Sequence, residues 1–177
     1  MKKIFATWEK LSGMFYPTFY LYYRIYKNVI AKEIELANIN ANDNVLNIGC
    51  GAIPFTAIHI AKITGAKVTA MDIDEEAVEK CKKYLKKYKL NNNITVIKGN
   101  GEEKISDEFT VVIVALQVFN KEKTYNNLKN SFPTKFRAIF RIPTSKYSST
   151  YGDFPPDFQF ISSVEQNMKT FKKSVLL

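Results

Sequence analysis

Histidine and cysteine are scarce in this sequence. His59 is the single histidine, and the two cysteines, Cys50 and Cys81, stand far apart and form no CxxC pair. A structural zinc site needs a close group of cysteine and histidine ligands, so we expect no metal site. The same scarcity argues against a disulfide framework, and a reducing, cytoplasmic location is the expected one.

Long apolar runs are also missing. No stretch reaches the ~18 apolar residues that a membrane-spanning helix needs, and Glu9 and Lys10 interrupt the place where a signal peptide would have its apolar core. Seven glycines and six prolines in 177 residues are too few for a low-complexity chain. The length and the 46% hydrophobic content therefore indicate one globular domain without a membrane partner.

Positive charge is plentiful, but arginine is rare. Lysine and arginine number 26 against 17 acidic residues, a formal net charge of +9, yet Arg24, Arg137 and Arg141 are the only arginines. Arginine is the usual reader of bases and phosphates, whereas lysine is a hydrated point charge. A basic chain can attract nucleic acid, but we interpret these lysines mainly as a solvated surface and do not favour a nucleic-acid partner.

Strands and helices alternate along most of the chain. Short apolar runs bounded by turn residues predict strands, and apolar residues at helical spacing predict helices. The predicted strands are 44–48, 67–71, 94–97, 109–118 and 136–142, with a closing antiparallel pair at 158–164 and 174–177. The predicted helices are 54–63, one that Asp74 caps, and 121–130. This alternation predicts an α/β fold with a doubly wound, mainly parallel sheet.

Aromatic residues crowd the segment before the first strand, and they are Phe15, Tyr16, Phe19, Tyr20, Tyr22, Tyr23 and Tyr26. The absence of glycine and proline from Tyr20 to Leu36 predicts a helix there, and Gly13 and Pro17 predict a break before it. We therefore divide the chain into an N-terminal aromatic helical segment, residues 1–40, and an α/β domain, residues 41–177. The helix is expected to lie over the ligand edge of the sheet as a short lid.

Three successive strand ends carry residues suited to ligand binding. Gly49 and Gly51 follow the first strand, where glycine permits a tight turn and close approach of a ligand. Asp72 ends the second strand, where a carboxylate can accept hydrogen bonds from both ribose hydroxyls. Asn100 follows the third strand, where a polar side chain can reach an adenine edge. Parallel strands end at one edge of the sheet, so the three positions predict one ligand site.

The stretches VLNIGCGAIP, AMDID and GNGE together resemble the class I S-adenosylmethionine-dependent methyltransferase family, over about residues 44–118. The resemblance implies a Rossmann-like fold and S-adenosylmethionine as the cofactor. It implies that Gly49 and Gly51 face the methionine part, Asp72 the ribose and Asn100 the adenine. The further cofactor-binding residues that it implies are Cys50, Ile73, Gly101 and Leu116.

A narrower resemblance involves the stretch GCGAIPFTAIHIAK, which is similar to the GxGxxPxT stretch of nicotianamine synthases. Those enzymes share the fold and move the aminocarboxypropyl arm of S-adenosylmethionine. They carry a tyrosine followed seven residues later by a glutamate, the spacing of Tyr26 and Glu33. The resemblance implies that Glu33 is the base for an attacking amine and that Tyr26 positions the substrate. The alternative interpretation makes Glu33 and Glu35 part of a surface helix with i,i+4 charge pairs.

Three functions stay open at this point. Methyl transfer to a small-molecule acceptor comes first, because it is common on this fold; aminocarboxypropyl transfer with Tyr26 and Glu33 is the alternative; a non-catalytic cofactor-binding module is the third. We expect His59 to be packed within its helix rather than catalytic. Arg141 ends the fifth strand and either holds a carboxylate through two hydrogen bonds or forms a surface ion pair. The oligomeric state is left open.

Overall fold

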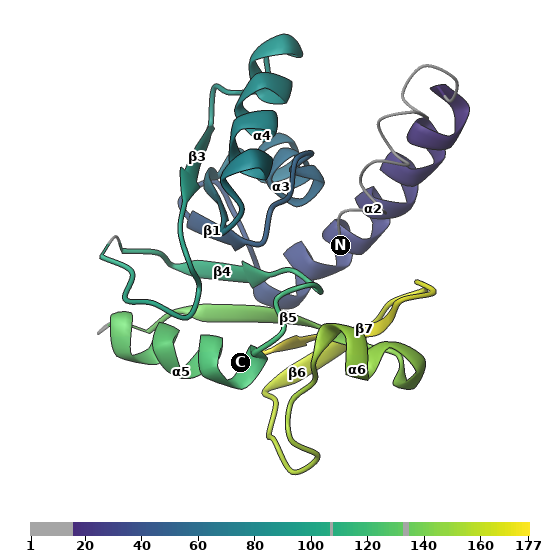
Figure 1. Cartoon of the computed structure of the whole chain (residues 1–177), viewed down its shortest axis with the longest axis vertical. Coiled ribbons are helices and arrows are strands. Elements are labelled where there is room, and N and C mark those ends of the chain that lie inside the picture. The colour runs from purple at the N-terminus through teal and green to yellow at the C-terminus, as the bar shows by residue number, and fades with distance from the viewer. Residues whose placement is uncertain (1–15, 107, 133–134) are drawn as a thin grey trace.

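A computed structural model describes residues 16–106, 108–132 and 135–177 (Figure 1). Residues 1–15 of the predicted N-terminal segment, Phe15 among them, lie outside the described residues. The first described element is helix α2 (Tyr16–Ala37). It begins earlier than predicted and includes Pro17, which is tolerated because the first turn of a helix needs no backbone N–H donor there.

In the described part of the chain, one sheet has seven strands in the order β3-β2-β1-β4-β5-β7-β6. The strands are β1 (Asn44–Ile48), β2 (Lys67–Asp72), β3 (Ile94–Lys98), β4 (Val111–Val114), β5 (Arg137–Pro143), β6 (Ser162–Glu165) and β7 (Phe171–Leu176). Strands β1 to β5 pair in parallel, and β7 runs antiparallel to both β5 and β6. The doubly wound, mainly parallel sheet and its closing antiparallel pair are confirmed.

The remaining described helices are α3 (Phe55–Thr64), α4 (Glu75–Lys87), α5 (Lys121–Ser131) and α6 (Ser148–Tyr151), with a 3₁₀ turn η1 (Ser145–Tyr147) before α6. Of these, the sequence predicts α3, α4 and α5, and it does not predict α6. The Asp74 side chain caps α4 by accepting a hydrogen bond from the Glu76 N–H at 2.9 Å. Gly65 ends α3 in the left-handed conformation, with φ of 77°.

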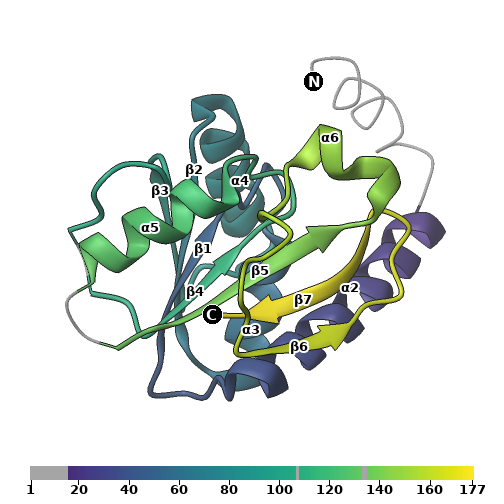
Figure 2. The ribbon, with the colours of Figure 1, turned by 90° about the horizontal axis from the view of Figure 1, so that it is seen from below.

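Alternate residues of the central strands pack into two cores. Val111 and Ile113 of β4 lie in the core beneath α2, α3 and α4, whereas Val112 and Val114 lie in the core beneath α5. Figure 2 shows α5 on one side of the sheet and α2 and α3 on the other. Burial on both faces explains why β4 is apolar without alternation.

Strand β4 ends earlier than the sequence predicts. The apolar run 109–118 predicts one strand, but pairing stops at Val114. The Ala115 N–H donates to the Ile48 carbonyl at 2.9 Å, and the Val118 N–H then donates back to the Ala115 carbonyl at 3.2 Å, so the chain turns over the sheet edge. Ala115 and Val118 are apolar in this loop because they pack on the turn after β1: a Cβ placed on Gly49 would lie 3.2 Å from Ala115 Cβ and 3.0 Å from Val118 Cγ2.

A buried ion pair joins α2 to the sheet. Arg141 of β5 donates through Nε to Glu33 Oε1 at 2.9 Å and through Nη2 to Oε2 at 2.8 Å. The Ser174 hydroxyl of β7 donates to Glu33 Oε1 at 2.7 Å. Glu33 is 0% and Arg141 1% exposed, so the surface-helix interpretation is wrong for Glu33 and the surface ion pair is wrong for Arg141. Glu35 is exposed, as that interpretation predicts.

Removing one partner of this pair leaves a buried charge without its counter-ion, so Arg141→Met is expected to lower the free energy of unfolding by about 3–5 kcal/mol. The double variant Glu33→Leu/Arg141→Met is expected to recover most of that loss, because an apolar pair has no charge to desolvate. Chemical denaturation of the wild type, both single variants and the double variant measures this cycle. Strictly additive effects would contradict a coupled pair.

The control for this cycle is Lys82→Met, which removes one partner of the exposed Lys82–Glu79 ion pair on α4. Exposed pairs contribute little, so this variant is expected to change the free energy of unfolding by less than about 1 kcal/mol.

His59 lies buried inside α3, and its ring lies 4.3 Å from that of Tyr23 between centroids. Its predicted packed role is confirmed. Burial, and to a smaller extent the charge of Lys62, lowers the pKa of His59 to about 4. The folded chain therefore holds this imidazole neutral at pH values where the unfolded chain protonates it.

Protonation of His59 in the unfolded state gives the protein an acid-sensitive part of its stability. That contribution is fully present above about pH 6.5 and is lost as the pH falls toward about 4. In His59→Leu this part of the slope is expected to disappear. Urea denaturation of both proteins from about pH 7.5 to about pH 5 measures the difference; equal slopes in the two proteins would contradict the assignment.

Candidate functional site

The loops after the parallel strands converge at the carboxyl edge of the sheet. The Gly49 N–H, after β1, donates to the Met71 carbonyl of β2 at 2.8 Å, and the Gly99 N–H, after β3, donates to the Asp72 carbonyl at 3.0 Å. Strand β1 lies between β2 and β4, where the strand order reverses. Open α/β sheets bind ligands at that point, so this edge is the candidate site.

The turn after β1 depends on glycine and leaves its backbone open. Gly49 and Gly51 have φ values of 78° and 66°, in the left-handed region that side chains rarely adopt. A Cβ placed on Gly51 would meet no heavy atom within 4 Å. In β1, the carboxamide oxygen of buried Asn47 has no hydrogen-bond partner among the described residues. The backbone at Gly51 thus leaves room for a ligand.

Asp72 lies half-buried at the end of β2 and shapes the glycine turn. Its Oδ2 accepts a hydrogen bond from the Gly51 N–H at 2.7 Å, and its Oδ1 accepts one from the Asp74 N–H at 3.0 Å. An ionised carboxylate has about four lone-pair sites, so two further donors can still be accepted. The next residue, Ile73, is 65% exposed and offers an apolar surface at the same edge.

The remaining residues of the predicted cofactor set lie in the loops after β3 and β4. Asn100 is half-buried and engaged in its own turn, since its Oδ1 accepts from the Glu102 N–H at 3.0 Å and its Nδ2 donates to Glu103 at 3.1 Å. Gly101 and Leu116 are buried. The structure thus brings the predicted set to one edge, with the Asn100 amide already used within its loop.

Cys50 and Cys81 are neighbours in space despite their separation in the sequence. Both are buried free thiols. A side-chain hydrogen bond with Cys81, followed by burial, raises the pKa of the Cys50 thiol. Cys50, between the two glycines of the turn, is therefore a neutral thiol.

Within 16–106, 108–132 and 135–177, no group of three or more histidine, cysteine, aspartate or glutamate side chains could hold a metal ion. In that part of the chain, no helix combines the length and the apolar character needed to cross a membrane.

Tyr26 and Glu33 belong to one network with Arg141. The Arg141 Nη1 donates to the Tyr26 hydroxyl at 3.4 Å, and its Nη2 donates to Thr56 Oγ1 at 3.0 Å. Thr56 lies in the first turn of α3, directly after the glycine turn, and the Tyr26 ring packs on Phe55 beside it. The structure therefore brings the two predicted catalytic residues together, but it places the Glu33 carboxylate in a closed, buried network.

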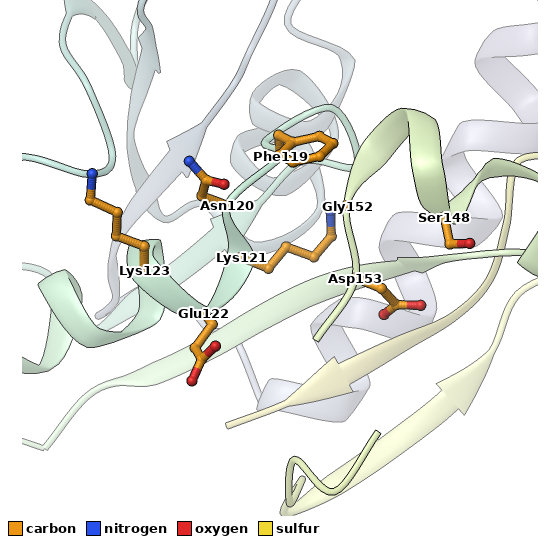
Figure 3. A pocket seen from close by; sticks show the side chains of 8 residues that line it. All are labelled: Phe119, Asn120, Lys121, Glu122, Lys123, Ser148, Gly152 and Asp153. Carbon is orange, nitrogen blue, oxygen red and sulfur yellow. The ribbon is translucent and has the colours of Figure 1, made fainter. Parts of the chain in front are cut away.

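A cavity of about 500 Å³ lies where the loop after β4 meets the segment of α6 (Figure 3). Phe119 is 55% exposed there, whereas Lys121 is 1% exposed. Burial lowers the pKa of Lys121 to about 8, and Asp153 partly offsets that effect. The residues that line the cavity are Phe119, Asn120, Lys121, Glu122, Lys123, Ser148, Gly152 and Asp153.

Two buried polar residues of this region, Asn47 and Lys121, were not predicted as site residues from the sequence. Asn47 carried a signal, because a polar residue interrupts the apolar run of a buried strand. Lys121 carried none, because a lysine in the first turn of a polar helix is ordinarily exposed.

Several solved structures share this fold. A variant of the nicotianamine synthase MtNAS in complex with S-adenosylmethionine gives a TM-score of 0.77 at 24% identity, covering 96% of this chain and 65% of that chain. An RNA methyltransferase from Salinibacter ruber in complex with S-adenosyl-L-homocysteine gives 0.66 at 21% identity, covering 84% of this chain and 90% of that chain. At these identities the likeness shows the fold.

Curated proteins match shorter stretches. Over 49 residues the chain is 43% identical to the L-histidine 2-aminobutanoyltransferase of Pseudomonas aeruginosa, which is 28% of this chain and 19% of that protein. Over 64 residues it is 36% identical to a sterol 24-C-methyltransferase of Saccharomyces cerevisiae, which is 36% of this chain and 16% of that protein. The chain thus matches less than a fifth of the length of either relative.

A family model described as a methyltransferase domain matches residues 39–173. The match includes β1 to β5, the glycine turn and the loops after β2, β3 and β4. It covers well over half of the chain and agrees with the strand order of the sheet. The chain therefore belongs to the class I S-adenosylmethionine-dependent methyltransferase domain family.

Proposed function

We propose that this member of the family transfers the aminocarboxypropyl arm of S-adenosylmethionine to an amine of a small molecule. The observation that carries the proposal is the likeness to MtNAS over 96% of the chain, a share that takes in most of α2. The match to a 2-aminobutanoyltransferase supports it, because that name denotes a four-carbon amino-acid group, as the aminocarboxypropyl arm is.

The cofactor contacts in this proposal follow the geometry of the carboxyl edge. The open backbone at Gly51 would receive the methionine part. The Asp72 carboxylate would accept from the ribose hydroxyls at its two unused lone-pair sites. The other residues proposed to surround the cofactor are Gly49, Cys50, Ile73, Asn100, Gly101 and Leu116.

The contribution of the protein is to position S-adenosylmethionine so that one particular carbon attached to its sulfur faces the acceptor. Bound S-adenosylmethionine supplies a sulfonium whose three attached carbons are all electrophilic, and positioning of reactants lowers a barrier by about 7–11 kcal/mol. The cavity beside Phe119 lies within the usual volume for a small ligand, roughly 300–1,000 Å³. Two carboxylates, Glu122 and Asp153, line it, and carboxylates favour an amine as the acceptor.

Tyr26 and Glu33 stay a prediction as catalytic residues. Tyr26 is half-buried and so the more accessible of the two. Glu33 would need to part from Arg141 or Ser174 before it could take a proton from an amine, and this favours an anchoring role for it. The lid role of α2 and the division of the chain at residue 40 also stay predictions.

Methyl transfer to a small molecule is the second candidate. The family model and the match to a sterol 24-C-methyltransferase favour it. The cofactor site would be the same in both reactions, and only the carbon that faces the acceptor would differ.

Mass spectrometry of the small molecules separates these reactions. The protein is incubated with S-adenosylmethionine and a metabolite extract, beside a control without the protein. The expected result is more methylthioadenosine than in the control. Transfer of the aminocarboxypropyl arm breaks the bond between that arm and sulfur, and the methyl group stays on the sulfur. S-adenosylhomocysteine in place of methylthioadenosine would overturn the first proposal and support methyl transfer. Binding of the cofactor with neither product would support the non-catalytic module.

Asp72→Ala tests the proposed cofactor contacts. The variant removes both the acceptor for ribose and the hydrogen bond that shapes the turn at Gly51, so the affinity for S-adenosylmethionine is expected to fall at least ~tenfold, as loss of hydrogen bonds to a charged group predicts. Isothermal calorimetry measures the affinity, and a thermal melt checks the fold. Glu79→Gln, which removes the same charge from an exposed position of α4, is the matched control. Equal affinity in the wild type and Asp72→Ala would contradict the ribose assignment.

A further inference from the structure

Lys121 begins α5, but its side chain connects two other segments, the loop after β4 and the segment 145–154 that contains α6. The ammonium donates to the carbonyl oxygens of Leu116 at 3.1 Å and Val118 at 2.9 Å, in the loop after β4, and to that of Tyr151 at 2.6 Å, the last residue of α6. A lysine ammonium has three N–H donors, which these three bonds use. Figure 3 shows the side chain extending from α5 toward Gly152.

The loop after β4 and the segment 145–154 also touch at a second point. Gly152, directly after α6, has a φ of 68°, and a Cβ placed there would overlap the carbonyl oxygen of Phe119. Glycine is therefore required for this approach of the two backbones. The Lys121 ammonium holds the segments together where Gly152 lets them meet, and both segments line the cavity of about 500 Å³.

One of these segments also packs on the proposed cofactor turn. A Cβ placed on Gly49 would lie 3.0 Å from Val118 Cγ2, and Asn120 donates to Glu102, in the loop after β3, at 2.8 Å. The loop after β4, which Lys121 holds against α6, is thus fixed to the proposed cofactor edge. We propose that Lys121 is a positioning residue. It sets the distance between the cofactor edge and the segment 145–154, which contains α6 and forms the far side of the acceptor cavity. This inference rests on the proposed function, because it assigns the cavity to the acceptor.

Burial of a lysine ammonium at this position is unfavourable, and its three hydrogen bonds to carbonyl groups compensate for it. Burial disfavours the ammonium form and lowers the pKa of Lys121 to about 8, with a partial offset from Asp153. The other charged groups that line the cavity are Glu122 and Lys123, and Lys123 is paired with Glu102 at 2.8 Å. A methionine would fill a similar volume without that cost, but it would leave three carbonyls without their donor. The neutral amine has two N–H donors for the same three carbonyls.

Hydrogen exchange of the full chain, resolved by peptide, tests the connection. In Lys121→Met, exchange over residues 145–154 is expected to rise at least ~tenfold, while exchange in β1, β4 and β5 stays within ~twofold, because only the local contact is lost. Lys123→Met removes the same charge from the same helix and cavity and is expected to leave both regions unchanged. Unchanged exchange over 145–154 in Lys121→Met, or an equal rise throughout the sheet, would overturn the proposal.

Two further measurements keep the test decisive if Lys121→Met does not fold. Gly152→Ala separates the same segments without touching the ammonium and is expected to raise exchange over the same residues. In the wild type, protection of 145–154 relative to the sheet is expected to fall between about pH 7 and about pH 9.5, as the ammonium loses its proton and one donor. Absence of either change would contradict the proposal.

Cofactor binding and product formation separate this inference from the proposed function. S-adenosylmethionine affinity of Lys121→Met is expected within ~threefold of wild type, and product formation with the metabolite extract is expected to fall at least ~tenfold, because misplacement of reactants slows their reaction. If the wild type forms no product while the exchange result holds, the proposed function fails and the link between the two segments stands. Full product formation by a variant with a loosened 145–154 segment would overturn the positioning role.

Discussion

The place of β1 between β2 and β4 is the constraint on which the rest of the site depends. Since the strand order reverses there, loops from four strands reach one edge with short connections. Side chains from the neighbouring strand ends and loops hold the turn after β1: the Asp72 carboxylate accepts from the Gly51 N–H, and Val118 packs against Gly49. The glycine turn and the loop after β4, which lines the cavity, are therefore parts of one packed unit.

The sequence predicts this edge well because its features are local. Gly49, Gly51 and Asp72 stand directly at strand ends, and parallel pairing brings such ends together whatever the side chains between them. The cap at Asp74 and the stop at Gly65 are likewise set by the residue type at one position. The fold class and the placement of the predicted cofactor residues could therefore be derived from the sequence before the structure.

The charged residues of the interior could not be predicted in this way. Glu33 looks like a surface residue of a lysine-rich helix, and its burial depends on Arg141, 108 positions further along. Lys121 looks like an ordinary first-turn residue, and its burial depends on carbonyl groups of the loop after β4 and of helix α6. A local pattern carries no information about such partners. The early end of β4 was missed for a similar reason, since an apolar run also suits a loop that packs on glycine.

The ion pair of Glu33 also affects the order of folding. Its partners Arg141 and Ser174 lie 108 and 141 positions further along the chain. Until β5 and β7 have formed, docking α2 on the sheet would bury an unpaired carboxylate at a cost of several kcal/mol. Contacts so distant in sequence also close slowly. We therefore expect helix α2, although it precedes every described strand, to join the fold late, after the sheet that it covers has been assembled.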